Sequence, residues 1–171
     1  IDILICNVGN GKSVAPGNET PEEWQRIFKS NFWSATNMVE AGKNVLSESR
    51  GVIVCISSIC GNEVIPSAPI TYSTAKAALN FYVKSISKPL GKAGVRINAI
   101  SPGNILFEAS TWQKKIDLDP QKVELMLEND VALKKLGKPD DIANLTCYLS
   151  SSLASFATGS IWTIDGGQVR N

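Results

Sequence analysis

Apolar residues along the chain gather in short runs that are separated by longer amphipathic segments. Two of these runs, Ile1–Cys6 and Gly51–Ser57, are almost continuously apolar, as expected for strands that are covered on both faces. Two more β-rich runs follow at Val95–Ile100 and Ser160–Ile164. Because these runs alternate with helical segments, the pattern predicts an α/β fold with a parallel sheet and helices on both of its faces.

The segments between the runs carry helix signals. The first predicted helix covers about Pro21–Leu46, because Thr20 and Glu23 form a capping box and proline is favoured at the first helical position. Asn31 falls on the apolar stripe of this helix. A buried amide has to be hydrogen-bonded, so we expect Asn31 either to bind a neighbouring backbone group or to hold a water. Further helices are predicted at about Tyr72–Pro89, Pro120–Asn129 and Pro139–Ser151.

The stretch from Asn104 to Lys138 is more charged than the rest and carries only one predicted helix. It follows Ser101-Pro102-Gly103, a sharp break at the carboxyl end of a predicted strand, where ligands bind in open α/β sheets. We therefore expect residues 104–138 to form a mobile segment that covers a substrate. The whole chain, residues 1–171, is predicted to be a single domain, because one core suffices for this length.

Composition excludes several classes of function. The chain is 43% hydrophobic and 19% charged with a net charge of +1, so nothing indicates a nucleic-acid partner. Its apolar runs are too short to cross a membrane, and no signal-peptide pattern opens it. Histidine is absent, which excludes Ser-His-Asp and Cys-His catalysis and histidine-ligated metals. Four cysteines fit no zinc spacing and favour reduced thiols in a cytoplasmic protein: Cys6, Cys55, Cys60 and Cys147.

Ser58, Tyr72 and Lys76 are the candidate catalytic residues. Tyr72 and Lys76 are four residues apart, so they share one face of a helix. An ammonium beside a phenol favours the phenolate, and we therefore expect Lys76 to lower the pKa of Tyr72. Ser58 closes the preceding strand and is placed to hydrogen-bond the same substrate oxygen, which suits proton transfer to or from a carbonyl or alcohol. Taken singly, the same residues also fit a solvated helix pair and a loop cap.

Several motifs occur together in a fixed order. They are Ile1–Gly9 (IDILICNVG), Val52–Gly61 (VIVCISSICG), Tyr72-x-x-x-Lys76, Val95–Gly103 (VRINAISPG), Thr158-Gly159 and Asp165-Gly166-Gly167. In this order and spacing the chain resembles the classical short-chain dehydrogenase/reductase family, from that family's strand four to its C-terminus. The resemblance implies a Rossmann-like, doubly wound parallel sheet whose N-terminal strands, with their Gly-rich phosphate loop, are missing from this chain.

The resemblance also implies an oxidoreductase that interconverts a carbonyl and a secondary alcohol with NAD or NADP. Tyr72 would be the general acid/base, Lys76 would lower its pKa and hold the nicotinamide ribose, Ser58 would orient the substrate oxygen, and Asn31 would keep a water for proton relay. The expected assembly is a homodimer or homotetramer that pairs the helices at Pro21–Leu46 and Tyr72–Lys88. The residues implied to bind the cofactor are Asn7, Gly9, Tyr72, Lys76, Pro102, Gly103 and Ile105.

Some features depart from the family or leave alternatives open. Phe107 stands where many members carry a threonine that contacts the nicotinamide amide, and we expect it to line the substrate site with Trp112 and Met126. Cys60 follows Ser58 closely, but without histidine or another nearby base it is interpreted as a small packed residue. The alternative function is that of a truncated, non-catalytic remnant that acts as an interaction or structural protein.

Overall fold

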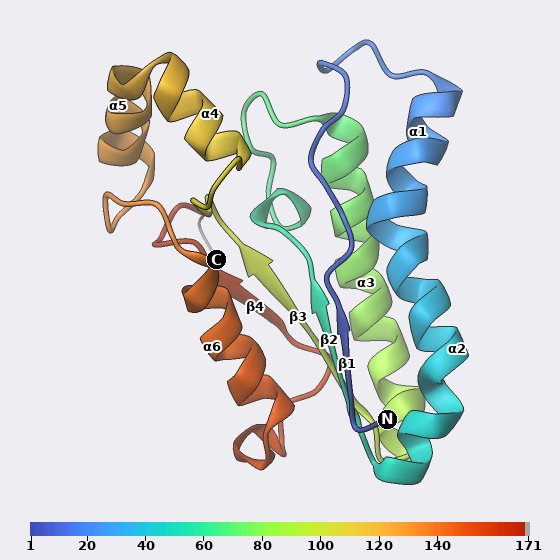
Figure 1. Ribbon diagram of the computed structural model, residues 1–171. Coiled ribbons are helices and arrows are strands. Elements are labelled where there is room, and N and C mark those ends of the chain that lie inside the picture. Colours follow the sequence, from blue (N-terminus) through green and yellow to red (C-terminus); the bar gives the residue numbers. More distant parts are fainter. Residues whose placement is uncertain (170–171) are drawn as a thin grey trace.

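The computed structural model describes residues 1–169 and confirms the predicted α/β architecture. Within these residues a single sheet has four strands in the order β1-β2-β3-β4, and every neighbouring pair is parallel. The carboxyl ends of the strands therefore lie at one edge of the sheet (Figure 1). The strands are β1 (Ile3–Cys6), β2 (Val52–Ile56), β3 (Arg96–Pro102) and β4 (Ile161–Ile164).

Helices cover the sheet on two sides (Figure 1). One face is covered by α1, α2 and α3, the opposite face by α6, and α4 with α5 stands beyond the carboxyl ends of the strands. This arrangement is the three-layer form that alternating strands and helices predict. The helices are α1 (Pro21–Phe28), α2 (Ser34–Ser49), α3 (Ile70–Lys92), α4 (Thr111–Leu118), α5 (Pro120–Asp130) and α6 (Pro139–Ser150), with short turns η1 (Lys29–Trp33), η2 (Ile59–Gly61) and η3 (Ser152–Ala154).

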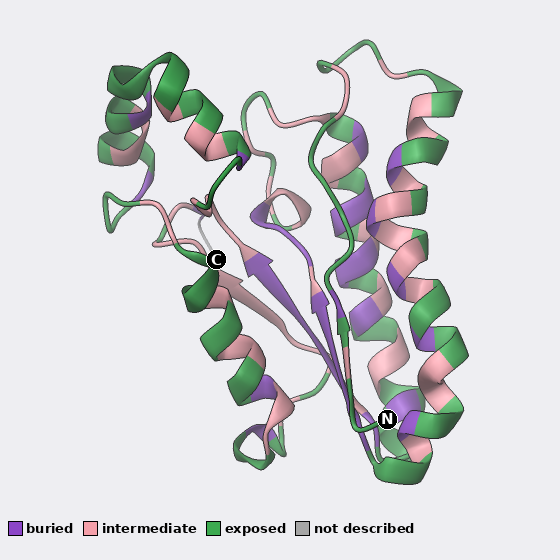
Figure 2. Cartoon of the chain, viewed as in Figure 1, coloured by how far each residue is buried: buried purple, intermediate pink, exposed green. Residues whose placement is uncertain are grey.

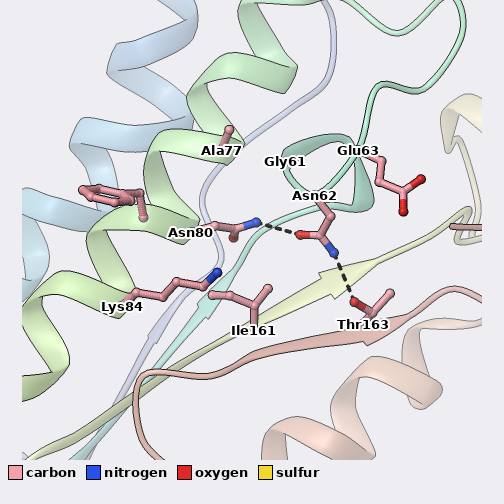
Figure 3. Close-up of a pocket in the computed structure, with 9 residues that line it drawn as sticks. Gly61, Asn62, Glu63, Ala77, Asn80, Lys84, Ile161 and Thr163 are labelled. Atoms are coloured by element: carbon pink, nitrogen blue, oxygen red, sulfur yellow. Dashed lines mark hydrogen bonds between the residues drawn. The ribbon is translucent and has the colours of Figure 1, made fainter. Parts of the chain in front are cut away.

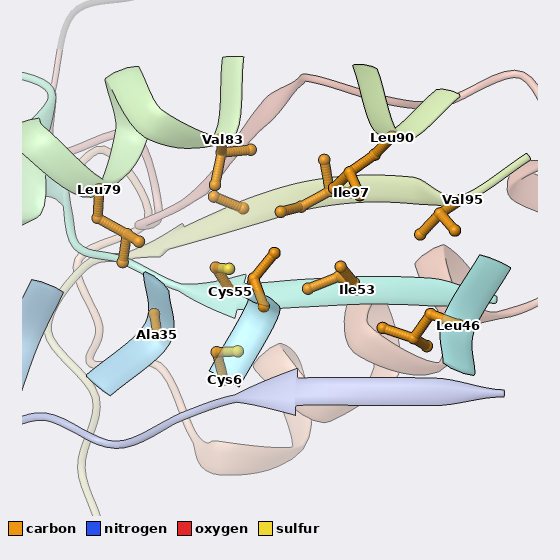
Figure 4. Close-up of a cluster of buried hydrophobic side chains, with 12 residues drawn as sticks. Cys6, Ala35, Leu46, Ile53, Cys55, Leu79, Val83, Leu90, Val95 and Ile97 are labelled. Carbon is orange, nitrogen blue, oxygen red and sulfur yellow. The ribbon is translucent and has the colours of Figure 1, made fainter. Parts of the chain in front are cut away.

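Each side of the sheet has its own apolar core. The larger one lies between the sheet and helices α2 and α3, and Figure 4 shows Leu79, Val83 and Leu90 of α3 above the strands. The smaller one lies under α6 and includes Val54 and Leu149. The central strands β2 and β3 are the most deeply buried part of the fold (Figure 2). Complete burial of such side chains contributes about 1.5–3 kcal/mol each, which fixes the strand ends that carry the site.

The apolar sequence of β1 predicted a strand that is covered on both faces. Within residues 1–169 only one face of this strand is covered. Leu4 and Cys6 pack against the larger core, whereas Ile3 and Ile5 are 49% and 41% exposed. The exposure follows from where the strand lies in the sheet. Among the described residues β1 is an edge strand, and helix α6, which covers the opposite face, packs on β2 and β3. Successive strand residues point to opposite faces, so only alternate residues reach the covered side.

The first predicted helix is continuous but not regular. Between α1 and α2 the chain forms one π-helical turn, Lys29–Trp33, and Asn31 lies inside it. Such turns frequently occur at functional sites, because the wider turn changes where a side chain points. The predicted helix start is confirmed, since the Thr20 hydroxyl accepts a hydrogen bond from the Glu23 backbone N–H and proline occupies the first turn. Only this half of the predicted capping box forms, because the Glu23 carboxylate binds the Ser13 hydroxyl and the Arg26 guanidinium instead.

Two helix predictions were wrong in extent. Helix α3 does not end at Pro89 but continues to Lys92, because Leu90 of its last turn is buried in the larger core and holds that turn in place. The covering segment contains α4 as well as α5, and α4 begins where the Ser110 hydroxyl accepts a hydrogen bond from the Gln113 backbone N–H at 3.0 Å. Ser110 is a normal N-cap residue, and this signal was available in the sequence.

Gly61 allows the close approach of η2 to α3, and this contact yields a first prediction. A β-carbon at residue 61 would lie 2.6–2.9 Å from backbone atoms of Lys76 and Ala77, which cannot move away without shifting the helix. In the intact protein that carries this chain, Gly61→Ala is therefore expected to lower the free energy of unfolding by about 1–3 kcal/mol. Urea denaturation measures the change.

The control is Gly91→Ala in helix α3, where an added β-carbon meets no atom within 4 Å. An alanine there is expected to be neutral or to stabilise by up to about 1 kcal/mol, since glycine is a poor helix former. Equal unfolding free energies for the two variants would contradict the proposed close contact between η2 and α3.

Candidate active site

The candidate site forms where the first two turns of α3 meet the carboxyl end of β2. Ser57 anchors this junction: its backbone N–H donates to the Ile100 carbonyl at 2.7 Å, and its hydroxyl donates to the Lys76 carbonyl at 3.4 Å. Ser58 follows and caps η2, with its hydroxyl oxygen accepting a hydrogen bond from the Cys60 backbone N–H at 3.2 Å. Ser57 thus ties strand to helix, while Ser58 lies close enough to Tyr72 for its hydroxyl to oppose the rise in the Tyr72 pKa.

Lys76 is a buried cation. Its residue is 4% exposed, and its Nζ donates to the Ile56 carbonyl at the end of β2 at 2.8 Å. The same Nζ lies 5.8 Å from the centroid of the Tyr72 ring, as the four-residue spacing predicted. The solvated helix pair is thereby excluded for Lys76, because a lysine is rarely this deeply buried unless it is held by a partner.

Asn31 is held by protein groups on both ends of its amide. It is 1% exposed; its Oδ1 accepts from the Asn10 backbone N–H at 3.0 Å, and its Nδ2 donates to the Ile27 carbonyl at 3.1 Å. Of the two expectations for this residue, the bond to the backbone is the one observed. The water that the family resemblance implies stays a prediction.

Gly9 brings the parts of the site together. A β-carbon at this residue would lie 2.7 Å from Asn31 Oδ1 and 3.3 Å from Lys76 Nζ. The loop after β1 therefore passes directly over the asparagine and the lysine, and only glycine leaves this space free. Residues from the loop after β1, from the π-helical turn and from α3 thus converge on one place.

Burial controls the proton affinities at the site. Burial raises the pKa of Tyr72; the hydrogen bond with Ser58 acts in the opposite direction, and nearby Cys60 adds to the rise. Burial also lowers the pKa of Lys76 to about 8, with a smaller opposing effect from Cys55. The prediction that Lys76 lowers the tyrosine pKa was wrong for this chain, because desolvation of the phenol dominates and the ammonium is directed at the Ile56 carbonyl.

The other predicted cofactor residues lie at the same end of the sheet but have different neighbours. Asn7 is exposed just after β1. Pro102 ends β3 and is half-buried, and an added β-carbon at Gly103 would lie 2.7 Å from the Cα and Cβ atoms of Asp165. Ile105 forms an isolated bridge with Gly137 and lines a cavity of about 230 Å³. The structure therefore brings Gly9, Asn31, Ser58, Tyr72 and Lys76 together, while Gly103 packs against the turn after β4.

A cleft of about 640 Å³ lies between the loop that precedes α3 and the covering segment. Trp112 and Met126 line it, whereas Phe107 is not among its lining residues within residues 1–169 and is 55% exposed. Lys115 and Gln168 also line it and were missed by the sequence analysis; the Lys115 ammonium lies 4.1 Å from the centroid of the Trp112 ring. A cleft of this size therefore lies beside helices α4 and α5.

A second cavity, of about 420 Å³, opens beside α3 and β4 (Figure 3). Asn80 Nδ2 donates to Asn62 Oδ1 at 2.8 Å, and Asn62 Nδ2 donates to Thr163 Oγ1 at 3.1 Å. Ser101 adds a third hydrogen bond, to the same Asn62 oxygen, at 3.2 Å. This network joins η2, α3, β3 and β4, and its residues are separate from the tyrosine cluster. Isolated asparagines carry no sequence signal that would have predicted it.

Two classes of site are not found in the described part of the chain. No three side chains among His, Cys, Asp and Glu lie close enough to hold a metal ion within residues 1–169. No helix in the same range combines the length and the apolarity needed to cross a bilayer.

Comparisons with known proteins agree with this geometry. The family model described as Enoyl-(Acyl carrier protein) reductase matches residues 1–168. The isoepoxydon dehydrogenase of Aspergillus clavatus is 37% identical over 168 residues, which are 98% of this chain and 63% of that protein. The chain therefore belongs to the short-chain dehydrogenase/reductase family.

Solved structures give the same result. A short-chain dehydrogenase/reductase from Burkholderia thailandensis superposes with a TM-score of 0.89 at 31% identity, over 98% of this chain and 65% of that one. A 7α-hydroxysteroid dehydrogenase, solved with NADH and 7-oxo glycochenodeoxycholic acid, superposes with a TM-score of 0.86 at 27% identity, over 100% of this chain and 65% of that one. The chain thus spans slightly less than two thirds of the relatives that it matches, and its fold is the Rossmann-like fold of the family.

The buried Lys76 predicts a specific pH dependence of stability. Its pKa is about 8 in the folded protein and 10.5 ordinarily, so below pH 8 both states are protonated and the penalty of burying the cation is fully present. Between pH 8 and 10.5 only the unfolded state holds the proton, so stability contributed by this residue rises with pH. The shift corresponds to about 3 kcal/mol.

Lys76→Met removes this effect, and we expect the difference in unfolding free energy between variant and parent to change by up to about 3 kcal/mol from pH 8 to 10.5. Urea denaturation at a series of pH values measures it. Lys84→Met, which removes an exposed lysine of the same helix, is the control for loss of one charge. Parallel pH profiles for Lys76→Met and the parent would contradict the burial of the Lys76 cation.

Proposed function

We propose that the protein carrying this chain is an NAD(P)-dependent oxidoreductase that interconverts a carbonyl and a secondary alcohol, with Tyr72 as the general acid/base. The observation that carries the proposal is the convergence of Ser58, Tyr72, Lys76 and Asn31 beneath Gly9. Relatives named as dehydrogenases and reductases support the reaction class and do not favour the alternative of a non-catalytic remnant.

The protonation state of Tyr72 fits the reduction of a carbonyl. Because burial raises the Tyr72 pKa, the phenol is protonated at neutral pH and can donate its proton to a developing alkoxide. Ser58 lies beside Tyr72, so its hydroxyl is placed to bond the same oxygen and to orient it. In the direction of alcohol oxidation the same phenol has to be deprotonated first, so a bound group that stabilises the phenolate would be needed.

The residues present fit a nicotinamide cofactor. Gly9 packs its backbone directly against Asn31 and Lys76 and is itself exposed, so a ligand could approach the backbone of this loop closely from the open side. Asn7, Gly9, Lys76 and Tyr72 would hold the cofactor on one side, and Pro102, Gly103 and Ile105 would contact it from the end of β3. When bound, NAD(P) supplies the hydride chemistry, and this chain supplies orientation and the proton.

Asn31 is assigned a positioning role in this proposal. Its hydrogen bond from the Asn10 backbone N–H holds the loop that contains Gly9, and its bond to the Ile27 carbonyl fixes the amide in the π-helical turn. A water relay through the remaining lone pair of Oδ1 is compatible with these bonds, because a carbonyl oxygen accepts two hydrogen bonds. The substrate is a small carbonyl or alcohol that enters the cleft next to Trp112 and Met126.

The proposed setting is cytoplasmic and oligomeric. Cys6, Cys55, Cys60 and Cys147 are all free thiols, as is usual in a reducing compartment. Apolar side chains on the outer faces of α2 and α3 favour a self-complementary contact with a second copy, since Met38 is 53% and Phe81 is 73% exposed.

Phe81→Glu tests this assembly. Introducing a charge into a buried two-fold contact is expected to convert a dimer or tetramer of the intact protein into smaller species in light scattering at micromolar concentration. Leu118→Glu on α4, where the leucine is 87% exposed, is the control and should leave the mass unchanged. A parent protein that is already monomeric would refute the proposed assembly.

Tyr72→Phe tests the catalytic assignment. It removes only the phenolic hydroxyl, so turnover of a panel of ketones with NADH or NADPH should fall by at least about 100-fold, as expected for loss of a general acid. Cofactor affinity, measured by fluorescence titration, should stay within a few-fold of the parent.

Tyr82→Phe is the matched control on the same helix. Its ring packs edge-on against Phe32 at 6.1 Å between centroids, and phenylalanine preserves that contact. Turnover of this variant should equal that of the parent. If Tyr72→Phe keeps activity within a few-fold of Tyr82→Phe, Tyr72 is not the acid/base.

A further inference from the structure

Cys6 and Cys55 lie directly opposite each other in neighbouring parallel strands. They are register partners in the β1–β2 ladder, and both side chains belong to the larger apolar core. Figure 4 shows them on the same side of the sheet, below helix α3. Both are free thiols, and the catalytic proposal uses neither of them.

The backbone geometry is suitable for a covalent link. Neighbouring strands are about 4.7–4.9 Å apart, which lies inside the range of about 4.4–6.8 Å that disulfides span between Cα atoms. Register partners in a sheet point to the same face, so the two sulfurs approach each other rather than diverge. The two side chains therefore lie together in the larger core and are close enough for each thiol to shift the pKa of the other.

We propose that Cys6 and Cys55 form an oxidation-sensitive dithiol site that a hydroperoxide converts reversibly into a disulfide. Such a bond would join β1 and β2 at the point where β1 leads into Asn7 and β2 leads into Ser57 and Ser58. In a reducing compartment disulfides of this kind are transient and respond to oxidants.

The chemistry balances with hydrogen peroxide as the oxidant. A Cys6 thiolate attacks one peroxide oxygen, the O–O bond breaks, and a sulfenic acid and a hydroxide ion result; the proton that the Cys6 thiol released converts the hydroxide into the first water. The Cys55 sulfur then attacks the sulfenic sulfur, the S–O bond breaks, and the second water leaves with the thiol proton. Two thiols are oxidised by two electrons, and one peroxide is reduced to two waters.

The two cysteines differ in a way that assigns these roles. Cys6 is 8% exposed whereas Cys55 is 0% exposed, so an oxidant reaches Cys6 first. The hydrogen bond from Cys55 lowers the pKa of Cys6, while the same bond and burial raise the pKa of Cys55. The thiolate is the nucleophile, so Cys6 is the residue that reacts first.

The other thiols are differently placed. Cys60 is half-buried beside Ser58 and Ser73, and burial raises its pKa. Cys147 is exposed on α6, on the opposite side of the sheet. Neither of them is a register partner of another cysteine in the strands that the structure describes.

Peptide mapping of the intact protein tests the proposal. After treatment with hydrogen peroxide, the free thiols are alkylated and the protein is digested with trypsin without reduction. We expect the peptide that ends at Lys12 to be linked to Gly51–Lys76, with the loss of two hydrogen atoms, and dithiothreitol to release both peptides. Fragment ions distinguish Cys55 from Cys60 within the second peptide.

Matched variants make the assignment specific. We expect Cys60→Ala to keep the disulfide-linked pair of peptides, and Cys55→Ala and Cys6→Ala each to abolish it. Two single variants are used so that a folding defect in one of them does not decide the result. A linked pair that persists in Cys55→Ala would overturn the proposal. So would a parent protein whose Cys6 and Cys55 are both still alkylated, or oxidised only to sulfinic acid, after peroxide treatment. The readout requires no enzyme activity, so it is independent of the proposed function.

Discussion

The hydrogen bond from Lys76 Nζ to the Ile56 carbonyl joins helix α3 to the end of strand β2, and the site depends on it. A lysine ammonium inside a core is unfavourable unless it is bonded, so this contact fixes how far α3 can lie from the sheet. Gly61 and Gly9 each leave room for the approach, one next to the backbone of residue 76 and the other next to its ammonium. Tyr72, one turn earlier on the helix, is thereby held beside Ser58.

Much of the fold could be predicted from local sequence. Short apolar runs and the capping box at Thr20 and Glu23 correctly indicated the strands and the start of α1. The parallel order follows from the alternation of strands and helices. The continuation of α3 past Pro89 could not be predicted, because it depends on burial of Leu90 in a core formed by distant residues. The π-helical turn around Asn31 likewise has no local signal, since it serves bonds to Asn10 as well as to its own helix.

The proximity of Tyr72 and Lys76 could be predicted from the sequence, but the electrostatics of the candidate site could not. Spacing alone placed Tyr72 and Lys76 on one face, and it suggested that the cation lowers the phenol pKa. Burial acts on both groups in the same sense, toward the neutral form, so it raises the pKa of the tyrosine and lowers that of the lysine. Sequence spacing contains no information on desolvation, which requires knowing what packs around the pair. The network of Asn62 and Asn80 was missed for a related reason, because its partners come from four separate elements.

Strand β1 connects the two sites. Leu4 and Cys6 face the covered side, and Ile3 and Ile5 face outward, so the strand contributes half of its residues to the larger core. Cys6 is the last residue of this strand, and its register partner Cys55 lies near the end of β2. A thiol behaves as a small apolar side chain in a core, so the pair fits the larger core without the hydrogen bonds that a buried amide would need. Two oxidisable sulfurs therefore lie just upstream of Asn7 and of Ser57, where the strands lead into the candidate site.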